Sequence, residues 1–514
     1  MQGTQQGKHP RLWGAVAATS LLYAAAHPPW SIWPAALVAV APVAAVLLDR
    51  RAAIGWRRAA LAGAAFGFAT TWLIAGYWSF LAARQFLPQS LATPLAVTAA
   101  LPLVAAAAAL HYAIGFALAA RLAGLGAAAG VIGSAALWTL AEIVRTSLGY
   151  GNPWGAFAAA LTPIDVALSG MRAETPVADL LRVGGMPAVA FVATAIGSSL
   201  GLAWTERKSR VRRGRALAAG AIVVLACVGV ASAARSFPLA RGDDAIPNQP
   251  LRVALVQTGI AASRPWQSGG AADAFRRNLD LTGSLETRGA DLIVWSEDSL
   301  PFLLDANVER RQVLRELARV HHAALLLGGS HSVAAGDGVA RVYNSAILFP
   351  ADGSEPQIYD KGTGPVLFRV KDWVIAPLIC LEAIYPGAAA ARAGEGADLL
   401  INISNDSWFD EGAGSEQHFR LAMLRAAETS RPLVRVATTG VSALVGADGL
   451  VSWRLPVHSA GVALLDVIPP REDSLYVRGG RSGFVLIVVV LSAAAAILPG
   501  RARRNRDRYL SHEP

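Results

Sequence analysis

Apolar residues gather into long, nearly uninterrupted runs in the first half of this chain. Seven runs approach the ~20 residues that a membrane-spanning helix requires, and they lie at about 11–27, 31–48, 59–81, 91–120, 125–146, 183–205 and 216–235. An eighth run lies near 482–499. The pattern predicts a multi-pass α-helical membrane domain over 1–240, an eighth span, and a basic tail at 500–514.

Residues 250–470 follow a different pattern, in which short β-rich runs alternate with charged segments and none reaches spanning length. The runs expected to form strands are 251–257, 291–297, 323–330, 344–350, 374–382, 397–405, 432–440, 441–449 and 461–467. Apolar positions recur at helical spacing in 271–289, 308–322 and 415–430. Helices that alternate with apolar strands predict sheets covered by helices, so this segment is expected to be one α/β domain tethered at both ends.

Composition supports a membrane protein. Of the 514 residues, 54% are hydrophobic and 16% are charged, with a mean hydropathy of +0.41. A soluble globular chain is about 45–50% apolar and roughly 25% charged. These values exclude a disordered, a fibrous or a small disulfide-stapled protein.

The net charge of +10 has a positional explanation. Arginines and lysines cluster near residues 8–11, 50–58, 207–215 and 501–508. With eight spans, all four clusters fall on one side of the membrane, and short basic loops stay cytoplasmic. The α/β domain is therefore expected outside the cytoplasm, and no nucleic-acid partner is expected. The first run could be a secretion signal, but this charge distribution favours its retention as a span.

The two cysteines lie in different surroundings, Cys227 in an apolar run and Cys380 in PLICLEAIYP. A disulfide between them is not expected, and Cys227 is expected to be inert. The histidines lack the spacing of metal ligands, so neither a metal nor a cofactor is expected.

Three residues near the ends of expected strands suggest catalysis: Glu297 ends DLIVWSE, Lys361 follows QIYD, and Cys380 lies in VIAPLICLE. Taken singly, each is more often structural, since a cysteine in an apolar strand is usually a core residue. Taken together, a carboxylate base and a cation supply what a thiol needs to become a nucleophile. The combination predicts acyl transfer through a thioester, with Lys361 and the backbone N–H after Cys380 stabilising the oxyanion.

The motifs VWSE, YDK and ICLE, in that order, resemble the Glu, Lys and Cys motifs of the nitrilase superfamily. The further segments LVQTGIAASRPW, LLINISNDSWF, QHF and RAAETSRPLVRVATTGVSALV, behind seven apolar runs, resemble the bacterial apolipoprotein N-acyltransferase family. HPPWSIWP, GFATTW, WTLAEIVR and GNPWG extend the resemblance into the apolar half.

The resemblance implies an αββα nitrilase-like domain facing the periplasm from the bacterial inner membrane. It also implies transfer of an acyl chain from a phospholipid to Cys380, and then to the N-terminal amine of diacylglyceryl-cysteine in a lipoprotein. Glu297 corresponds to the general base, Lys361 to the oxyanion stabiliser, Glu382 to a supporting carboxylate and Trp266 to a wall of the site. A monomer is expected.

Five further features bear on substrate choice. Only 18 residues separate Lys361 from Cys380, Asp372 is the sole acid among them, and the family's LVPFGE-like stretch with its glutamate is missing. Leu381 replaces the usual aromatic after the cysteine, and Ser296 the usual proline before the base. The shortened segment predicts a more open site. Two alternatives therefore stay open: a related membrane-bound acyltransferase or amidase with another substrate, and a catalytically weak lipid-binding paralogue.

The remaining candidates lie in two segments after the nucleophile strand. Asn405 and Trp408 form a turn that is equally consistent with a lip of the site and with ordinary turn chemistry. His418 opens an expected helix and is expected to orient groups of the site.

Overall fold

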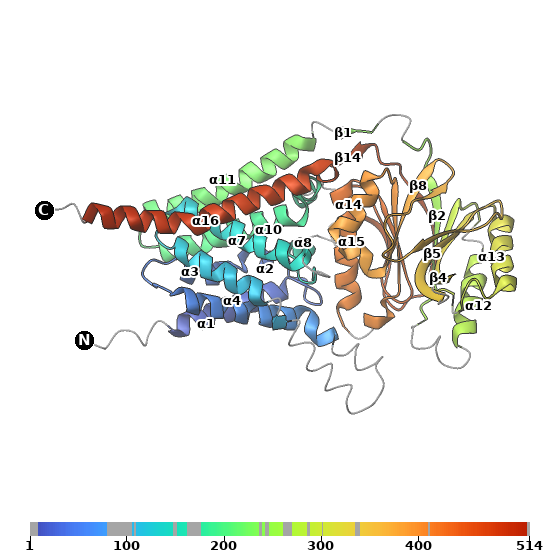
Figure 1. Ribbon diagram of the computed structural model, residues 1–514, viewed down its shortest axis with the longest axis horizontal. Helices are drawn as coiled ribbons and strands as arrows, with labels where there is room; N and C mark the ends of the chain where they lie inside the picture. The colour runs from blue at the N-terminus through green and yellow to red at the C-terminus, as the bar shows by residue number, and fades with distance from the viewer. Residues whose placement is uncertain are drawn as a thin grey trace, which may run out of the picture. The chain divides into compact units, whose positions relative to one another are not determined.

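A computed structural model describes residues 9–79, 105–106, 109–147, 152–161, 176–235, 239–241, 246–260, 270–284, 288–300, 302–334, 340–409 and 412–510. The chain divides into two compact units, one helical and one α/β (Figure 1). The helical unit combines the first half of the chain with the C-terminal helix, and the α/β unit lies between them in sequence.

The helical unit is built from apolar helices, as the long runs predict. Its elements are α1 (His9–Ala25), α2 (Pro34–Val38), α3 (Ala41–Leu47), α4 (Trp56–Thr71), η1 (Trp72–Gly76), η2 (Ala120–Leu122), α7 (Ala127–Ser147), α8 (Phe157–Leu161), α10 (Pro176–Thr205), α11 (Arg210–Arg235) and α16 (Arg481–Leu510). Over the described part of the chain, five helices are long and apolar enough to cross a membrane: Trp56–Ser79, Ala127–Ser147, Pro176–Thr205, Arg210–Arg235 and Tyr476–Ile497.

Three of the eight expected spans are not among these five helices. The run at 11–27 forms α1, which has 17 residues. The run at 31–48 is divided into α2 and α3, each with a proline in its first turn, where the missing N–H of proline is tolerated. Most of the run at 91–120 lies outside the described residues, which here form the shorter apolar helix Ala109–Leu122. The number of membrane crossings stays a prediction.

The centre of the helical unit contains buried polar side chains. Tyr23 donates its hydroxyl hydrogen to Glu142 Oε1 at 2.8 Å, and both side chains are buried. Arg145 donates to the carbonyl oxygens of Asn152 and Trp154, at 2.7 and 2.6 Å. These bonds give Glu142 and one nitrogen of the Arg145 guanidinium a partner, which offsets part of the cost of burying charged groups among apolar helices.

The α/β unit contains two six-stranded sheets. One has the order β12-β11-β10-β9-β8-β7 and the other the order β13-β2-β3-β4-β5-β6. The strands of the first are β7 (Phe368–Val370), β8 (Trp373–Ile379), β9 (Leu399–Ser404), β10 (Leu433–Ala437), β11 (Ser442–Val445) and β12 (Val451–Leu455). Those of the second are β2 (Leu251–Gln257), β3 (Leu292–Trp295), β4 (Ala324–Ala334), β5 (Ala340–Phe349), β6 (Gln357–Asp360) and β13 (Gly461–Val467). Two further short strands, β1 (Leu239–Ala240) and β14 (Glu472–Asp473), pair with each other in a separate two-stranded sheet. In the sequence, β1 precedes the strands of the two large sheets and β14 follows them.

Alternation of side chains along the central strands produces four layers. In β2, Val253 and Leu255 face the core between the sheets, whereas Ala254 and Val256 face helices. Helices α12 (Gly270–Thr282) and α13 (Val308–His321) cover one sheet. Helices α14 (Pro386–Gly394) and α15 (Gly414–Thr429) cover the other (Figure 1). This αββα arrangement confirms the predicted fold class.

The central strands of each sheet are parallel. In one sheet β2 pairs with β3 and β3 with β4, and in the other β8 pairs with β9 and β9 with β10. Their ends differ from the sequence expectation. The strand expected at 291–297 ends at Trp295, and the strand expected at 374–382 ends at Ile379, where the 3-10 turn η5 (Cys380–Ile384) begins. The helix expected at 271–289 ends at Thr282. Glu297 and Cys380 therefore lie after their strands and outside the hydrogen-bonded ladder, so their backbone groups are available to bind other partners.

Candidate active site

Three strand ends bring Glu297, Lys361 and Cys380 to one place. Glu297 lies two residues after β3, Lys361 directly follows β6, and Cys380 directly follows β8. The Nζ atom of Lys361 lies 3.3 Å from Glu297 Oε1. The charges of both residues act on the Cys380 thiol. The structure thus assembles the three residues that the sequence singles out.

Glu297 is buried and held at both carboxylate oxygens. Its Oε1 atom accepts hydrogen bonds from Asn344 Nδ2 at 2.7 Å and from Lys361, and its Oε2 atom accepts from the backbone N–H of Asn405 at 2.8 Å. Burial raises the pKa of Glu297, and Asp298 adds to this, although Lys361 and the hydrogen bonds oppose it. A carboxylate with a raised pKa and fixed orientation is suited to accepting and returning a proton near neutral pH.

Lys361 is held as a cation. Burial alone would lower the pKa of its ammonium group, but the negative charge and hydrogen bond of Glu297, with the charge of Glu382, raise the pKa above its ordinary 10.5. Its backbone N–H donates to the carbonyl of Asn344 at 2.9 Å, which fixes the end of β6 against β5. A fixed positive charge beside a thiol favours an oxyanion formed there.

Cys380 occupies a strained turn. Its φ angle is +51°, a left-handed conformation that costs a non-glycine residue about 1–3 kcal/mol. Hydrogen bonds flank the turn: Ile379 N–H donates to Glu382 Oε2 at 2.8 Å, and Asn402 Nδ2 donates to the carbonyls of Leu378 and Cys380, at 2.9 and 3.2 Å. These bonds hold the thiol at the tip of a sharp strand-to-turn corner.

The thiol of Cys380 is a neutral group at rest. Burial raises its pKa, the negative charge of Glu297 raises it further, and Lys361 only partly opposes these effects. The nucleophile is therefore formed when a base removes the proton during attack. Glu297 is the buried carboxylate whose charge acts most strongly on this thiol.

Glu382 connects the nucleophile turn to the end of β6. Besides its bond to Ile379, it accepts from the Tyr359 hydroxyl at 2.5 Å and from the Gly362 N–H at 3.3 Å. Arg392 donates to the oxygen of that same hydroxyl at 2.7 Å. Glu382 thus joins the segments that carry Cys380 and Lys361, which agrees with a supporting role.

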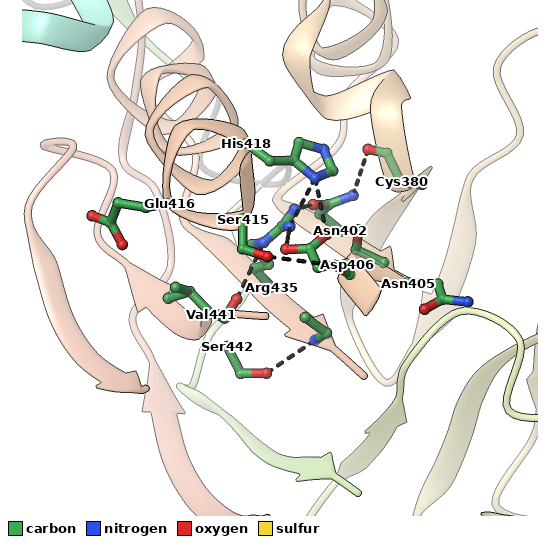
Figure 2. A network of polar contacts seen from close by, with 12 residues as sticks. Cys380, Asn402, Asn405, Asp406, Ser415, Glu416, His418, Arg435, Val441 and Ser442 are labelled. Atoms are coloured by element: carbon green, nitrogen blue, oxygen red, sulfur yellow. Dashed lines mark hydrogen bonds and ion pairs between the residues drawn. The ribbon is translucent and has the colours of Figure 1, made fainter. Parts of the chain in front are cut away.

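A second, fully buried network lies behind the nucleophile turn (Figure 2). Asp406 accepts from Arg435 Nη2 at 2.6 Å and from Ser404 Oγ at 2.7 Å, and its Oδ1 atom lies 2.9 Å from His418 Nδ1. Arg435 also donates to the side-chain oxygen of Asn402. This leaves the Asn402 amide nitrogen directed at the Cys380 carbonyl. The network therefore fixes the orientation of the amide that holds the nucleophile turn.

Charge balance sets the protonation states in this network. Burial would raise the pKa of Asp406, but the charge of Arg435 and the hydrogen bonds from His418 and Ser404 outweigh burial and hold the pKa well below 3.8. Burial and the charge of Arg435 lower the pKa of His418. The network is thus an ionised Asp406–Arg435 pair with a neutral imidazole, consistent with the expectation that His418 orients groups.

The remaining residues that the sequence suggested for the site differ from one another in burial. Asn405 is buried, and besides binding Glu297 through its backbone it donates from Nδ2 to Asp298 at 2.9 Å. Asn405 thus holds Glu297 and Asp298 in place, and its role as a lip of the site stays a prediction. Leu381 and Trp408 are exposed, at 36% and 45%. Trp266 lies outside the described residues.

Three contributors were missed by the sequence interpretation: Asn344, Asn402 and Arg435. Each is a polar residue within an apolar strand, in YNSAILF, LLINIS and PLVRVA. Because buried polar groups need hydrogen-bond partners, a polar residue within an apolar strand indicates a buried polar contact, and this pattern could have identified all three residues.

The short segment between Lys361 and Cys380 forms a simple hairpin. β7 pairs with β8 with Phe368 opposite Ile375 and Val370 opposite Trp373. Asp372 lies in the exposed turn, where its carboxylate accepts from the Asn248 N–H at 2.7 Å. The carboxylate of Asp372 is thus engaged with the backbone of Asn248.

A cavity of about 300 Å³ opens beside the residues that flank Glu297. Ser296, Asp298 and Asn405 form its polar wall, and Leu300 and Phe302 contribute apolar surface. Glu297, Lys361 and Cys380 themselves are not among the residues that line this cavity.

Comparison with known proteins agrees with both units. The apolipoprotein N-acyltransferase N-terminal domain family matches residues 19–199, and the carbon-nitrogen hydrolase family matches residues 252–472. The apolipoprotein N-acyltransferase of Pseudomonas putida is 29% identical over 98% of this chain and 99% of its own. Those of Brucella suis biovar 1 and Pseudomonas syringae pv. tomato are 29% and 28% identical, over 94% and 72% of this chain and 94% and 75% of their own.

Among solved structures, an amidase from Nesterenkonia sp. aligns with 46% of this chain and 96% of its own, at 21% identity and a TM-score of 0.34. Saccharomyces cerevisiae Nit3, of the nitrilase superfamily, aligns with 46% of this chain and 94% of its own, at 18% identity and a TM-score of 0.33. The family matches cover the helical and the α/β parts separately, and the relatives extend along nearly the whole chain. The protein belongs to the apolipoprotein N-acyltransferase family of the carbon-nitrogen hydrolase superfamily.

Proposed function

We propose that the protein transfers an acyl chain from a membrane phospholipid, through a thioester on Cys380, to the N-terminal α-amine of a diacylglyceryl-cysteine lipoprotein. The observation that carries the proposal is the meeting of Glu297, Lys361 and Cys380, each of which follows the end of a different strand. The apolar helical unit supports a lipid donor and a lipid-modified acceptor, since both reside in the bilayer. Its family relatives are named for lipoprotein N-acylation.

The first half-reaction forms the thioester. Glu297 removes the Cys380 thiol proton as the sulfur attacks the ester carbonyl carbon of the phospholipid. The negative charge that develops on the carbonyl oxygen is stabilised by the Lys361 ammonium and the backbone N–H of Leu381. The ester C–O bond then breaks, Glu297 returns the proton to the departing alkoxide, and a lysophospholipid leaves.

The second half-reaction transfers the acyl chain. The neutral α-amine of the acceptor attacks the thioester carbon and gives a proton to Glu297. Collapse of the tetrahedral intermediate breaks the C–S bond, and Glu297 returns the proton to the departing Cys380 sulfur. The products are an amide and the original thiol, so atoms and charge balance without a cofactor.

We also propose that the chain lies in the bacterial inner membrane with its α/β unit in the periplasm. The four basic clusters then all lie on the cytoplasmic side, as short basic loops do. This orientation gives the α/β unit access to exported lipoproteins.

Mass spectrometry of a model lipoprotein tests the proposed acceptor. The lipoprotein is produced in cells depleted of their own N-acyltransferase and supplied with the wild type, Cys380→Ala or Cys227→Ala. We expect a third, amide-linked acyl chain with the wild type and Cys227→Ala only. A diacyl product in all three would contradict the proposed acceptor, and a triacyl product with Cys380→Ala would contradict the nucleophile.

A further inference from the structure

The helical unit contains a groove of about 900 Å³ that the proposed reaction does not use. It is bounded by α3, by the C-terminal end of α10, and by residues near the start of α1 and after α3. Its lining residues are Arg11, Val38, Ala41, Pro42, Ala45, Val46, Asp49, Arg51, Ala52, Leu200, Gly201, Trp204, Thr205 and Arg207. We call this feature the arginine groove.

The floor of the arginine groove is narrow and apolar because two helices approach closely. A Cβ atom at Gly201 of α10 would lie 2.4 Å from the carbonyl oxygen of Ala41 and 2.8 Å from the nitrogen of Ala45 in α3. Only glycine permits this approach. Val38 and Leu200 on the walls are 39% and 38% exposed, so the groove opens on an apolar helix surface. Such a track fits a hydrocarbon chain.

The other part of the groove is basic. Arg11, Arg51 and Arg207 line it, and Asp49 is the sole acid among the lining residues. The guanidinium of Arg207 lies 5.0 Å over the ring of Trp204, whose side chain is 67% exposed. Exposed tryptophan beside arginine is typical of the level of lipid headgroups.

The nearby acids are already engaged, and the groove keeps a positive balance. Glu206 pairs with Arg51 at 3.4 Å and with Arg212 at 3.6 Å. Asp49 accepts from the backbone N–H of Arg51 at 2.9 Å. Counting Glu206 together with the lining Asp49, the groove has three arginines against two acids, so a net positive charge remains to complement a phosphodiester.

We propose that the arginine groove binds one anionic phospholipid as a resident lipid, with its phosphate at the arginines and an acyl chain along the track over Gly201. The combination of an apolar track and a cationic end selects a lipid over a soluble anion and an anionic lipid over a zwitterionic one. The bound lipid bridges α1, α3 and α10 and is not consumed. In the orientation proposed above, it belongs to the cytoplasmic leaflet.

Native mass spectrometry of the full-length protein tests the proposal, using phosphatidylglycerol and phosphatidylcholine of equal chain length and soluble glycerol phosphate. The charge variant combines Arg11→Gln, Arg51→Gln and Arg207→Gln. Its matched control combines Arg210→Gln, Arg213→Gln and Arg215→Gln, which removes as many exposed charges from residues outside the groove. A second variant, Ala45→Leu, obstructs the track and leaves the charges unchanged.

We expect the wild type and the control to retain phosphatidylglycerol, and the groove variant to bind it about tenfold or more weakly. Ala45→Leu should also weaken binding, which keeps the test informative if the triple variant folds poorly. Equal losses in the groove variant and the control, or equal binding of phosphatidylcholine, would overturn the proposal. Equal competition by glycerol phosphate would reduce the groove to a simple anion site and also overturn it. Cys380→Ala should retain the lipid, so the outcome is independent of acyl transfer.

Discussion

Lys361 and Glu297 form an ion pair, with Nζ 3.3 Å from Oε1, although the strands that they follow, β6 and β3, are separated in their sheet by β4 and β5. The pair couples the two functions proposed for these residues. Lys361 favours the ionised carboxylate that accepts the thiol proton, while Glu297 holds Lys361 as an ammonium ion. Loss of either partner should therefore disturb both proton transfer and oxyanion stabilisation.

Replacing Glu297 by glutamine should slow thioester formation by about 10²–10⁴-fold, the usual contribution of a general base. The side chain keeps its size but no longer takes the proton of the Cys380 thiol. The rate is measured as transfer of an alkyne-tagged acyl chain from phospholipid to the protein. A rate close to that of the wild type would show that another group removes the proton.

The rate of Cys380 acylation should fall toward low pH at a midpoint above 4.5. Burial raises the pKa of Glu297, so the base loses its charge at a higher pH than an exposed glutamate does. The pKa of Lys361 is raised above 10.5, so loss of its charge affects the rate only in strongly alkaline solution. A pH series of acylation rates locates both limbs, and an acid midpoint below 4.5 would oppose this assignment.

Asn344→Leu should lower the acylation rate and move the acid limb to higher pH. The amide of Asn344 donates to Glu297 Oε1 at 2.7 Å, and this bond lowers the pKa of the carboxyl group. Its removal makes the carboxylate harder to form. A merely structural role would reduce the rate without moving the limb, so an unchanged midpoint would refute a positioning role for Asn344.

Asp372→Asn should leave the acylation rate within about twofold of the wild type, a change typical of a surface site. Its carboxylate binds the backbone of Asn248 in an exposed turn. Glu382→Ala should reduce the rate strongly, because Glu382 holds both Ile379 and Gly362 beside the two reactive residues. The reverse order of effects would make Asp372 the compensating acid of the shortened segment.

Asp406→Asn should destabilise the fold by about 3–5 kcal/mol, because it leaves the Arg435 charge buried without a counterion. The double variant Asp406→Asn, Arg435→Gln removes both charges and should recover part of this loss. Thermal unfolding of the two single variants and of the double variant measures the coupling between Asp406 and Arg435. Losses of stability that simply add in the double variant would contradict this coupling. The pKa of Asp406 is held below 3.8, so its stabilising effect is present above that pH and fades only in stronger acid.

The strands could be predicted from the sequence because short β-rich runs mark them, and the three reactive residues because they lie near the ends of those runs. Their boundaries could not. Cys380 continues an apolar run in sequence, yet its backbone leaves the strand because Glu382 and Asn402 bind the groups that a ladder would use. Those bonds depend on tertiary contacts and leave no local pattern.

The buried network illustrates the same limit. Arg435 looks like an isolated charge in PLVRVATTG, and only the pairing of β10 with β9 places it opposite Asn402. From there it directs the amide toward the Cys380 carbonyl. The order of residues along one strand therefore indicates that a partner is needed but does not identify it.

The most direct test of the account is identification of the acylated residue after reaction with a tagged phospholipid. Peptide mass spectrometry is applied to the wild type, Cys380→Ala and Cys227→Ala, before and after treatment with neutral hydroxylamine, which cleaves thioesters. The account predicts a hydroxylamine-sensitive acyl group on Cys380 in the wild type and in Cys227→Ala, and none in Cys380→Ala. Acylation that persists in Cys380→Ala and disappears in Cys227→Ala would contradict it.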